Sequence, residues 1–309
     1  MKIVSLLAAG TEFVCALGAG EFLVGRSHEC DNPSWVKRLP ALTAAAFDTS
    51  VTSRRIDAEV NRRLRAGESL YCVDQTAIGA LEPDLIITQS HCPVCAVSHH
   101  DLTQEACQLP GRTISLQAGS LAGIERDIRL IADALNRHAA GQDLIDLQRR
   151  RQARIHASLA GRNKPTVVVL EWIDPLFAMG NWGPELIDLA QGQPLLGNRG
   201  QHSRAIEWNS LAAADPEVLI IAPCGFSLER TRAELPALTQ HEQWHTLQAV
   251  RNGRVFLADG NLYFNRSGTS LTDTVDILAE ILHGYANRFM GIAWEPLTEK
   301  WNPPLRQPA

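Results

Sequence analysis

Two segments far apart in the chain share one pattern of hydrophobic and polar positions. Residues 80–92 (ALEPDLIITQSHC) and 213–225 (AADPEVLIIAPCG) each carry an acidic residue, a proline, a second acidic residue and an apolar run, followed by a polar turn that contains cysteine. An apolar run between turn-forming residues is typical of a strand buried on both faces of a parallel sheet. Each segment is therefore predicted to contain a helix end, a tight turn, a buried parallel strand and an exposed loop.

A second pair of segments, 2–18 and 166–192, repeats another pattern. Each begins with a β-branched apolar strand and continues through a loop into an amphipathic helix that ends at glycine. In the first helix, Thr11 is the expected N-cap and Gly18 the expected stop. Together the two pairs predict an α/β protein with two similar lobes, each built on a parallel sheet.

Helical spacing marks the stretch between the lobes. Apolar residues recur three or four positions apart over 124–135, which indicates one face of a helix, and a break is expected near Gly141. A long helical connector is a semi-rigid hinge, unlike a Gly/Ser linker. An extra helix is predicted over 53–71, and Trp294 and Trp301 are expected to pack onto the surface of a lobe. The pattern divides the chain into an N-terminal lobe (1–118), a helical connector (119–163), a C-terminal lobe (164–285) and a Pro/Trp-containing tail (286–309).

Composition and charge exclude several classes of protein. The net charge of −5 over 309 residues lacks the basic excess typical of nucleic-acid binders, and no segment reaches the length of about 20 apolar residues that a membrane span needs. The first residues match the strand that opens the second lobe, which favours a first strand over a signal peptide. We expect a cytoplasmic monomer as written, and a periplasmic protein if the true start lies upstream.

The chain has seven cysteines, and an odd number without a regular spacing fits a reducing compartment better than a disulfide framework. Three of them lie among apolar neighbours and are expected to be small core residues: Cys15, Cys72 and Cys107. The other four lie beside turn-forming polar residues and are candidates for a functional role: Cys30, Cys92, Cys95 and Cys224.

Ligands of open parallel α/β sheets bind beyond the carboxyl ends of the strands, so the loops after the predicted strands are the candidate site. Aromatic side chains in the second lobe suit a large planar ligand, although core packing is an equal alternative for Phe177 and Phe264. The aromatic candidates are Trp172, Phe177, Trp182, Phe226, Tyr263 and Phe264, and Cys224 lies in the same loops. The first-lobe candidates are polar or metal-ligating residues: Ser27, His28, Glu29, Cys30, His91, Cys92 and Cys95.

The Cys92-Pro-Val-Cys95 motif is ambiguous by itself. A structural zinc site needs four ligands, usually from two such pairs, and there is no second Cys-x-x-Cys. A redox pair at the start of a helix is physically possible. A mixed metal site of Cys30, Cys92 and Cys95 with His28 or His91 requires the loops to converge. All three interpretations stay open at this point.

Catalytic signatures are absent from the sequence. It contains no nucleophile elbow, phosphate loop, Gly-x-Gly-x-x-Gly or His-Glu-x-x-His motif. Glu12 and Glu171 could form a carboxylate pair, but a favourable position of Glu12 in the first turn of a helix is the preferred interpretation. No catalytic residue is assigned, no cofactor is required, and the protein is not expected to be an enzyme.

Six segments together form a recognisable pattern along the chain. They are KIVSLLAAGTEFVCALG (2–18), FLVGRSHECDNP (22–33), ALEPDLIITQSHCPVCAVS (80–98), LEWIDPLFAMGNWGPELIDLAQG (170–192), LAAADPEVLIIAPCGFSLERT (211–231) and GRVFLADGNLYFNRSG (253–268). These segments resemble the vitamin B12/iron-complex substrate-binding proteins of ABC importers. The resemblance is closest to the cobalamin-binding-protein-like branch that carries His-Glu-Cys-Asp and Cys-x-x-Cys-Ala-Val, and it extends over residues 2–285 in the expected order.

This resemblance implies two α/β lobes bridged by one long helix, with a cleft between them that takes a corrinoid, haem or another metal chelate. An ABC permease is then a candidate partner, although the missing export signal leaves a cytoplasmic corrinoid or metal-chelate role open. The implied cleft positions are Ser27–Cys30, His91–Cys95, Trp172–Trp182, Cys224–Phe226 and Asn261–Phe264.

Three hypotheses follow. The first is a non-enzymatic binding protein for cobalamin or a related metal tetrapyrrole. The second is a metal-binding or chelatase-like protein that uses Cys30, Cys92, Cys95 and His28 in the same frame. The third is a thiol oxidoreductase, which requires a thiolate of low pKa at Cys92 or Cys95.

Overall fold

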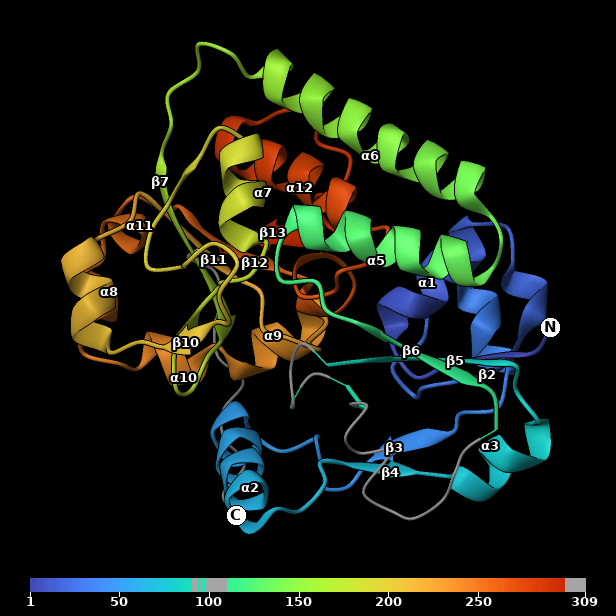
Figure 1. Ribbon diagram of the computed structural model, residues 1–309. Coiled ribbons are helices and arrows are strands. Elements are labelled where there is room, and N and C mark those ends of the chain that lie inside the picture. The colour runs from blue at the N-terminus through green and yellow to red at the C-terminus, as the bar shows by residue number, and fades with distance from the viewer. Residues whose placement is uncertain (91–93, 95, 98–109, 298–309) are drawn as a thin grey trace. The chain divides into compact units, whose positions relative to one another are not determined.

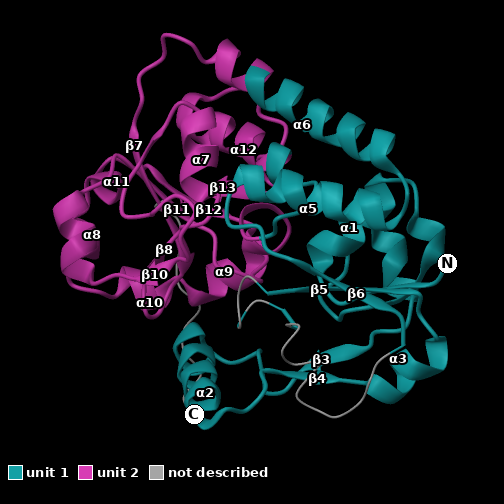
Figure 2. Cartoon of the chain, viewed as in Figure 1, with its two compact units in different colours: residues 1–153, 266–272 teal, residues 154–265, 273–309 magenta. Residues whose placement is uncertain are grey.

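The computed structural model describes residues 1–90, 94, 96–97 and 110–297 of the chain. The chain divides into two compact units (Figure 2). The division into four parts that was expected from the sequence stays a prediction. Unit 1 consists of Met1–Ala153 and Arg266–Thr272, and unit 2 consists of Arg154–Asn265 and Asp273–Ala309.

Unit 1 is built on a sheet with the strand order β2-β1-β5-β6, in which all neighbouring strands are parallel. Strands β2, β5 and β6 of this sheet are labelled in Figure 1. Every residue of β1 and β5 is buried, as expected for apolar runs in the centre of a parallel sheet. The predicted buried strand after Pro83 is therefore confirmed. The strands are β1 (Ile3–Ser5), β2 (Leu23–Arg26), β5 (Leu85–Gln89) and β6 (Arg112–Leu116).

The two faces of this sheet are covered by different elements. Val4 and Ile86 pack into an apolar cluster with Leu42 and Ile78, on the side of the antiparallel pair β3-β4 and of α3. On the opposite side, α1 approaches the sheet so closely that a Cβ on Gly10 would lie 2.7 Å from Ile87 Cγ2. These elements are α1 (Ala8–Ala16), η1 (Gly20–Phe22), η2 (Ser34–Arg38), β3 (Thr43–Ala45), α2 (Ser53–Ala66), β4 (Tyr71–Val73) and α3 (Gln75–Leu81).

The start of α1 differs from the prediction. The helix begins at Ala8 with Leu7 as its N-cap in an extended conformation, so the assignment of Thr11 as N-cap was wrong. Thr11 lies inside the helix, where its hydroxyl donates a hydrogen bond to the Cys30 thiol instead of capping. The predicted stop is confirmed, because Gly18 has a φ of 72°, in the left-handed region that favours glycine.

The connector forms two helices, α5 (Leu121–Ala134) and α6 (His138–Ser158). The break lies at residues 135–137, where Asn136 has a φ of 54°, so the predicted break is present shortly before Gly141. Gly141 lies inside α6 and faces Ala132 of α5. The division between the units falls inside α6, and a long helix therefore joins them, as predicted.

Unit 2 is built on a mixed sheet with the order β10-β8-β7-β11-β12-β13, with β9 paired to β7. The central strands β7, β11 and β12 are parallel, whereas β8, β10 and β13 join in antiparallel orientation. The strands are β7 (Thr166–Trp172), β8 (Phe177–Ala178), β9 (Gln193–Pro194), β10 (Arg204–Ala205), β11 (Val218–Ile221), β12 (Val255–Ala258) and β13 (Trp294–Pro296).

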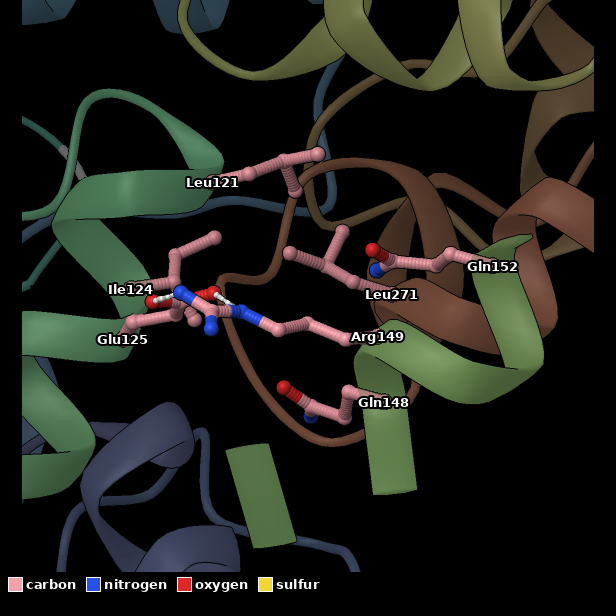
Figure 3. Close-up of a pocket in the computed structure, with 7 residues that line it drawn as sticks. All are labelled: Leu121, Ile124, Glu125, Gln148, Arg149, Gln152 and Leu271. Carbon is pink, nitrogen blue, oxygen red and sulfur yellow. Dashed lines mark hydrogen bonds and ion pairs between the residues drawn. The ribbon is translucent and has the colours of Figure 1, made fainter. Parts of the chain in front are cut away.

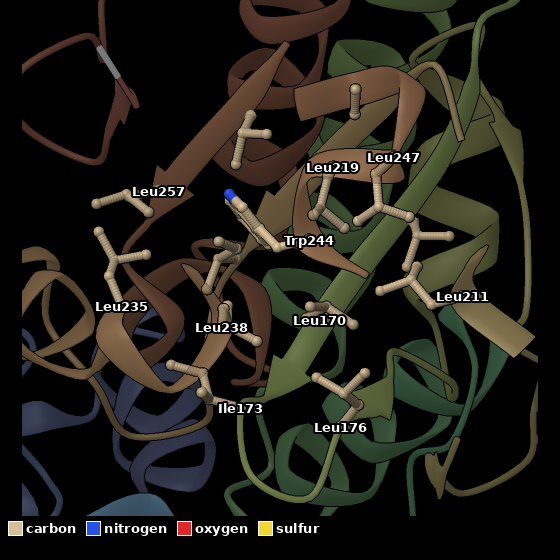
Figure 4. Packing of buried hydrophobic residues seen from close by; sticks show 14 residues of the cluster. Leu170, Ile173, Leu176, Leu211, Leu219, Leu235, Leu238, Trp244, Leu247 and Leu257 are labelled. Atoms are coloured by element: carbon tan, nitrogen blue, oxygen red, sulfur yellow. The ribbon is translucent and has the colours of Figure 1, made fainter. Parts of the chain in front are cut away.

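One large apolar cluster of unit 2 lies on one face of these central strands (Figure 4). Leu170, Leu219 and Leu257 from the three strands pack with Trp244 and Leu238 from the covering helices. Burial of such side chains contributes about 1.5–3 kcal/mol each to folding. The helices are α7 (Gly183–Leu189), α8 (Trp208–Ala214), α9 (Leu228–Glu234), α10 (Pro236–Thr239), η3 (Trp244–Thr246), α11 (Gln248–Arg251), the π-helix η4 (Gly260–Phe264) and α12 (Leu271–His283).

The repeat deduced from the sequence is present in the topology. Helix α3 leads into β5 and helix α8 leads into β11, and the acidic residues between them, Glu82 and Asp215, both have left-handed backbone conformations. The order β1-β5-β6 in unit 1 corresponds to the order β7-β11-β12 in unit 2. The prediction of two similar α/β lobes is therefore confirmed.

The segment after α12 adds an edge strand to unit 2. Trp294 in β13 pairs with Ala258 of β12, and its ring lies edge-on to Phe256 with centroids 5.7 Å apart. Its Nε1 donates a hydrogen bond of 2.8 Å to Glu280 Oε2. The expected packing of Trp294 is confirmed, and Trp301 lies outside the described residues.

Two of the three cysteines expected in the core are not buried. Cys15 is partly exposed and Cys72 is exposed. Cys72 alternates with Tyr71 and Val73, which pack against the unit 1 cluster, so the pleat of β4 turns its side chain outward. Cys107 lies outside the described residues. No helix in the described part of the chain is long and apolar enough to cross a membrane.

Candidate functional site

The loop that follows β2 in unit 1 is held by bonds to the neighbouring strands. Ser27 N donates to Ser5 O at 2.8 Å, at the end of β1. Thr43 Oγ1 donates to Ser27 Oγ at 3.0 Å and accepts from His28 N at 3.1 Å. The predicted positions Ser27–Cys30 therefore lie at the carboxyl edge of the parallel sheet, where such folds bind ligands.

His28 has a neighbour at each ring nitrogen. Nδ1 lies 2.7 Å from Thr43 Oγ1, and Nε2 lies 3.3 Å from Glu29 Oε1. The hydrogen bond from His28 lowers the pKa of the Glu29 carboxyl below its usual value, and the charge of Arg266 acts in the same direction against the effect of burial. Metal coordination by His28 would require one ring nitrogen to give up its neighbour.

Cys30 is fully buried behind these residues. Thr11 Oγ1 donates to Cys30 Sγ at 3.0 Å, and the thiol donates to Ser5 O at 3.7 Å. Burial raises the pKa of the Cys30 thiol to about 11, so the thiolate that metals and electrophiles require is disfavoured near pH 7. The assignment of Cys30 as a ligand or metal residue stays a prediction.

The Cys-x-x-Cys motif follows β5, and His91, Cys92 and Cys95 lie outside the described residues. Two described residues beside them are held by hydrogen bonds within unit 1. Tyr71 Oη donates to Val94 O at 2.5 Å, and Gln89 Nε2 donates to Ala96 O at 2.9 Å. Within the described ranges, no group of three or more His, Cys, Asp or Glu side chains could hold a metal ion. The mixed metal site therefore stays a prediction.

An aromatic pair lies at the carboxyl edge of the unit 2 sheet. Trp172 ends β7 and Phe226 follows β11, with ring centroids 5.3 Å apart and planes tilted by 57°. The guanidinium carbon of Arg230 lies 4.9 Å from the centroid of the Phe226 ring, a cation–π geometry. Cys224, a free and partly exposed cysteine, lies beside the pair and donates its backbone N–H to Glu171 O at 2.9 Å.

Trp172 also carries a buried donor. Its Nε1 has no hydrogen-bond partner among the described residues. A buried polar group without a partner costs about 1–3 kcal/mol, and such groups in native proteins often face a ligand or an ordered water. The Trp172 ring therefore carries a polar atom that the described part of the chain does not satisfy.

The other aromatic candidates have different environments. Trp182 and Phe264 are buried, and Trp182 Nε1 donates to Phe264 O at 3.0 Å. Tyr263 is partly buried, and this burial, followed by the charges of Asp273 and Asp259, raises the pKa of its hydroxyl. Phe177 in β8 is partly buried. The ligand roles of these four residues stay predictions.

A buried ion-pair cluster in unit 1 was missed by the sequence analysis. Arg266 Nη1 donates to Glu12 Oε1 at 3.1 Å and to Asp31 Oδ1 at 2.7 Å. Glu12 is not in the first turn of α1, so its assignment to the helix dipole was wrong. The signal in the sequence was Glu12, a charged residue between apolar neighbours in a predicted helix. Its partner Arg266 lies 254 positions away, and no sequence pattern identifies that partner.

A small hollow lies between α5 and α6 in unit 1 (Figure 3). Its volume of about 20 Å³ is enough for about one water molecule and far below the roughly 300–1,000 Å³ of small-molecule pockets. The Glu125–Arg149 ion pair, with an Nε–Oε1 distance of 2.5 Å, spans it. This hollow is too small for any of the predicted ligands. It is lined by Leu121, Ile124, Glu125, Gln148, Arg149, Gln152 and Leu271.

Solved structures share this fold. An ABC transporter substrate-binding protein from Listeria monocytogenes is 18% identical, with a TM-score of 0.70 over 92% of this chain and 98% of that one. A periplasmic haem-binding protein from Pseudomonas aeruginosa is 22% identical, with a TM-score of 0.68 over 96% and 95%. The periplasmic vitamin B12-binding protein of Vibrio cholerae is 18% identical, with a TM-score of 0.64 over 91% and 95%.

No curated protein matches the chain by sequence. The family model for periplasmic binding proteins matches residues 3–262, which is most of the chain. The expected relationship to the substrate-binding proteins of ABC importers is confirmed. The chain therefore belongs to the periplasmic binding protein family, whose members bind ligands and are not enzymes.

Proposed function

We propose that this protein binds cobalamin, or a related corrinoid, tetrapyrrole or other metal chelate, at the loops that follow the strands of its parallel sheets. The observation that carries the proposal is the pair of Trp172 and Phe226 at the carboxyl edge of the unit 2 sheet, with a buried indole donor that has no hydrogen-bond partner among the described residues. Aromatic faces supply apolar area for a planar ligand, and a few placed polar groups fix its orientation.

The chemistry of this edge fits the proposed class of ligand. Corrins and porphyrins combine a wide apolar face with peripheral acceptors, such as the amides of cobalamin or the propionates of haem. Trp172 Nε1 can donate to such an acceptor, and Arg230, stacked on Phe226, brings positive charge near the same surface. The related structures include a haem-binding and a vitamin B12-binding protein, which supports this class without choosing between its members.

The cobalamin branch is preferred because of the His28-Glu29-Cys30-Asp31 motif. The metal-binding alternative has less support, since Cys30 is buried and its thiol has a raised pKa. We further propose that the protein acts as a monomer and delivers its ligand to an ABC permease, in agreement with the role of its family.

Equilibrium titration with cobalamin, cobinamide, haem and a ferric siderophore tests the proposal. Binding is followed by the absorbance of the chelate and by calorimetry, with lysozyme, which has no haem site, as a control for nonspecific haem adsorption. We expect saturable 1:1 binding of at least one chelate with a Kd of about 1 μM or lower, which corresponds to about −8 kcal/mol. Absence of heat and of spectral change with all four chelates would overturn the proposed function.

A further inference from the structure

Arg266 is a buried cation held by the carboxylates of Glu12 and Asp31. Its side chain is 6% exposed, and that of Glu12 is 1% exposed. A charge withdrawn from water to this extent is tolerated only with well-placed ionic partners. The planar guanidinium also has fixed donor directions, so the cluster specifies the positions of the groups around it.

The Glu12 carboxylate holds the segment that carries Arg266. Its Oε2 accepts from Thr269 N at 2.8 Å and from Thr269 Oγ1 at 3.0 Å. Gly268 lies so close that a Cβ there would be 2.1 Å from Glu12 Oε2. Residues 266–272 belong to unit 1 although both neighbouring stretches of chain belong to unit 2, and these contacts explain why.

The other side of the guanidinium faces the loop after β2. Arg266 Nη1 donates to Asp31 Oδ1 at 2.7 Å, and Nη2 donates weakly to Glu29 O at 3.5 Å. These two residues flank Cys30, whose thiol accepts from Thr11. Helix α1 therefore holds the loop in two ways, directly through Thr11 and indirectly through Glu12 and Arg266.

We propose that Arg266 is a positioning residue that fixes the loop Ser27–Asp31 in the conformation that receives the ligand. This inference rests on the proposed function, which places Ser27–Cys30 in the ligand site. Arg266 acts through Asp31 and the Glu29 carbonyl and does not contact the ligand itself. Loss of the bond to Asp31 or of the bond to the Glu29 carbonyl releases the loop on the side of residue 31. The bond from Thr11 to Cys30 is then the remaining tie to α1 and opens more often.

The accessibility of Cys30 reports the order of this loop without any ligand. Each variant is treated with N-ethylmaleimide, and the modification rate of each cysteine is measured by peptide mass spectrometry. Asp31→Ala removes the loop side of the cluster and leaves the Glu12–Arg266 pair intact. We expect Cys30 to be modified about tenfold faster or more than in the native protein, because local opening governs access to a buried group. Cys15 in α1 and the exposed Cys72 are expected to keep their native rates.

Glu59→Ala is the matched control, since it removes a carboxylate from the ion pairs with Arg62 and Arg63 on α2 of the same unit. It is expected to leave the Cys30 rate unchanged. The double variant Glu12→Gln/Arg266→Met removes the cluster without leaving a lone buried charge and is expected to reproduce the Asp31→Ala result. Arg266→Lys is expected to give an intermediate rate, because an ammonium keeps the charge between the two carboxylates but lacks the second nitrogen that donates to the Glu29 carbonyl.

Two results would overturn the inference. A Cys30 rate within twofold of the native rate in both Asp31→Ala and the double variant would show that the cluster does not order the loop. A parallel rise at Cys15 and Cys30 would show a general loss of structure in place of positioning. If the native protein binds none of the four chelates, the proposed function fails while the Cys30 rates still decide the positioning role. If it binds one, we expect its Kd to rise about tenfold in Asp31→Ala and to stay unchanged in Glu59→Ala.

Discussion

Gly141 of α6 packs directly against Ala132 of α5, and a Cβ on Gly141 would lie 2.6 Å from the Cβ of Ala132. Both atoms would be attached to helical backbone, so neither could move aside without a shift of a whole helix. The glycine is therefore a requirement of the close approach between the two helices, and it does not interrupt α6.

Gly141→Ala is expected to lower the free energy of unfolding by about 1–3 kcal/mol, since overpacking of a tight contact outweighs the gain in helix propensity. Urea unfolding followed by circular dichroism measures the change. Gly79→Ala in α3 is the matched control, because a Cβ there meets nothing within 4 Å, and it is expected to be neutral or stabilising by up to about 1 kcal/mol. Equal effects of the two variants would contradict the packing argument.

The contact of Trp294 with Glu280 gives a second prediction. Glu280 is 3% exposed, and its carboxylate accepts from Trp294 Nε1 at 2.8 Å and from the backbone of Arg288 and Phe289. Trp294→Phe keeps an aromatic ring against Phe256 but removes one donor from a buried anion. We expect the free energy of unfolding to fall by about 1.5–3 kcal/mol, as is usual for hydrogen bonds to charged groups.

Chemical denaturation of Trp294→Phe and of Glu280→Gln measures the loss in the free energy of unfolding. The double variant Trp294→Phe/Glu280→Gln completes a mutant cycle, and the two effects are expected to be less than additive. Full additivity would mean that the indole and the carboxylate do not stabilise each other.

The fold was readable from the sequence where hydrophobic pattern and turn chemistry agreed. Continuous apolar runs gave β5 and β11, and the acidic residue and proline before each run marked the same helix end in both units. Positions decided by tertiary contact were not readable. Gly141 resembled a helix stop, because close helix packing and a helix stop both select glycine. Cys72 was expected in the core because its neighbours in sequence are apolar. It is exposed because β4 belongs to a two-stranded sheet with an outward face.

The candidate site was predictable in part for a related reason. Topology alone placed Ser27–Cys30 and Trp172 at the carboxyl edges of parallel strands, and both positions are found there. The sequence could not reveal that Cys30 would turn inward to Thr11. It also could not pair Glu12 with Arg266, because partners so distant in sequence are brought together only by the fold.

Asp127 of α5 makes the stability of unit 1 depend on pH. Its carboxylate accepts from Gln117 N and Ala118 N, but burial has the larger effect and raises its pKa from 3.8 to about 6. The folded state thus holds this proton more tightly than the unfolded chain does. The contribution of Asp127 to stability is full below pH 3.8 and is lost as the pH rises through about 6.

We expect the difference in unfolding free energy between the native protein and Asp127→Asn to fall by about 1–3 kcal/mol between pH 3.5 and 7.5. Denaturation curves at a series of pH values measure it. Asp143→Asn, at an exposed position of α6, is expected to show no comparable trend. A difference that stays constant across this range would mean that Asp127 keeps its ordinary pKa.

Substitution of Trp172 distinguishes a role in ligand binding from a role in the stability of the fold. Trp172→Phe keeps an aromatic ring beside Phe226 but removes a buried donor that has no partner within the described part of the protein. Without ligand, the free energy of unfolding is therefore expected to stay the same or to rise by up to about 1 kcal/mol, because an unsatisfied buried group is removed. The affinity for the bound chelate is expected to fall about 3- to 10-fold, the value of one hydrogen bond.

Trp172→Ala also removes the ring face, and we expect its affinity to fall about 30- to 100-fold. Trp208→Phe and Trp208→Ala are the matched controls, since Trp208 stacks on His241 with ring centroids 3.9 Å apart and begins α8, which leads into the amino end of β11. Both controls are expected to bind the chelate with native affinity, even where Trp208→Ala lowers stability. If Trp172→Phe lowers stability and affinity together, its Nε1 has a partner in the protein itself, and the aromatic edge of unit 2 does not act as the proposed ligand surface.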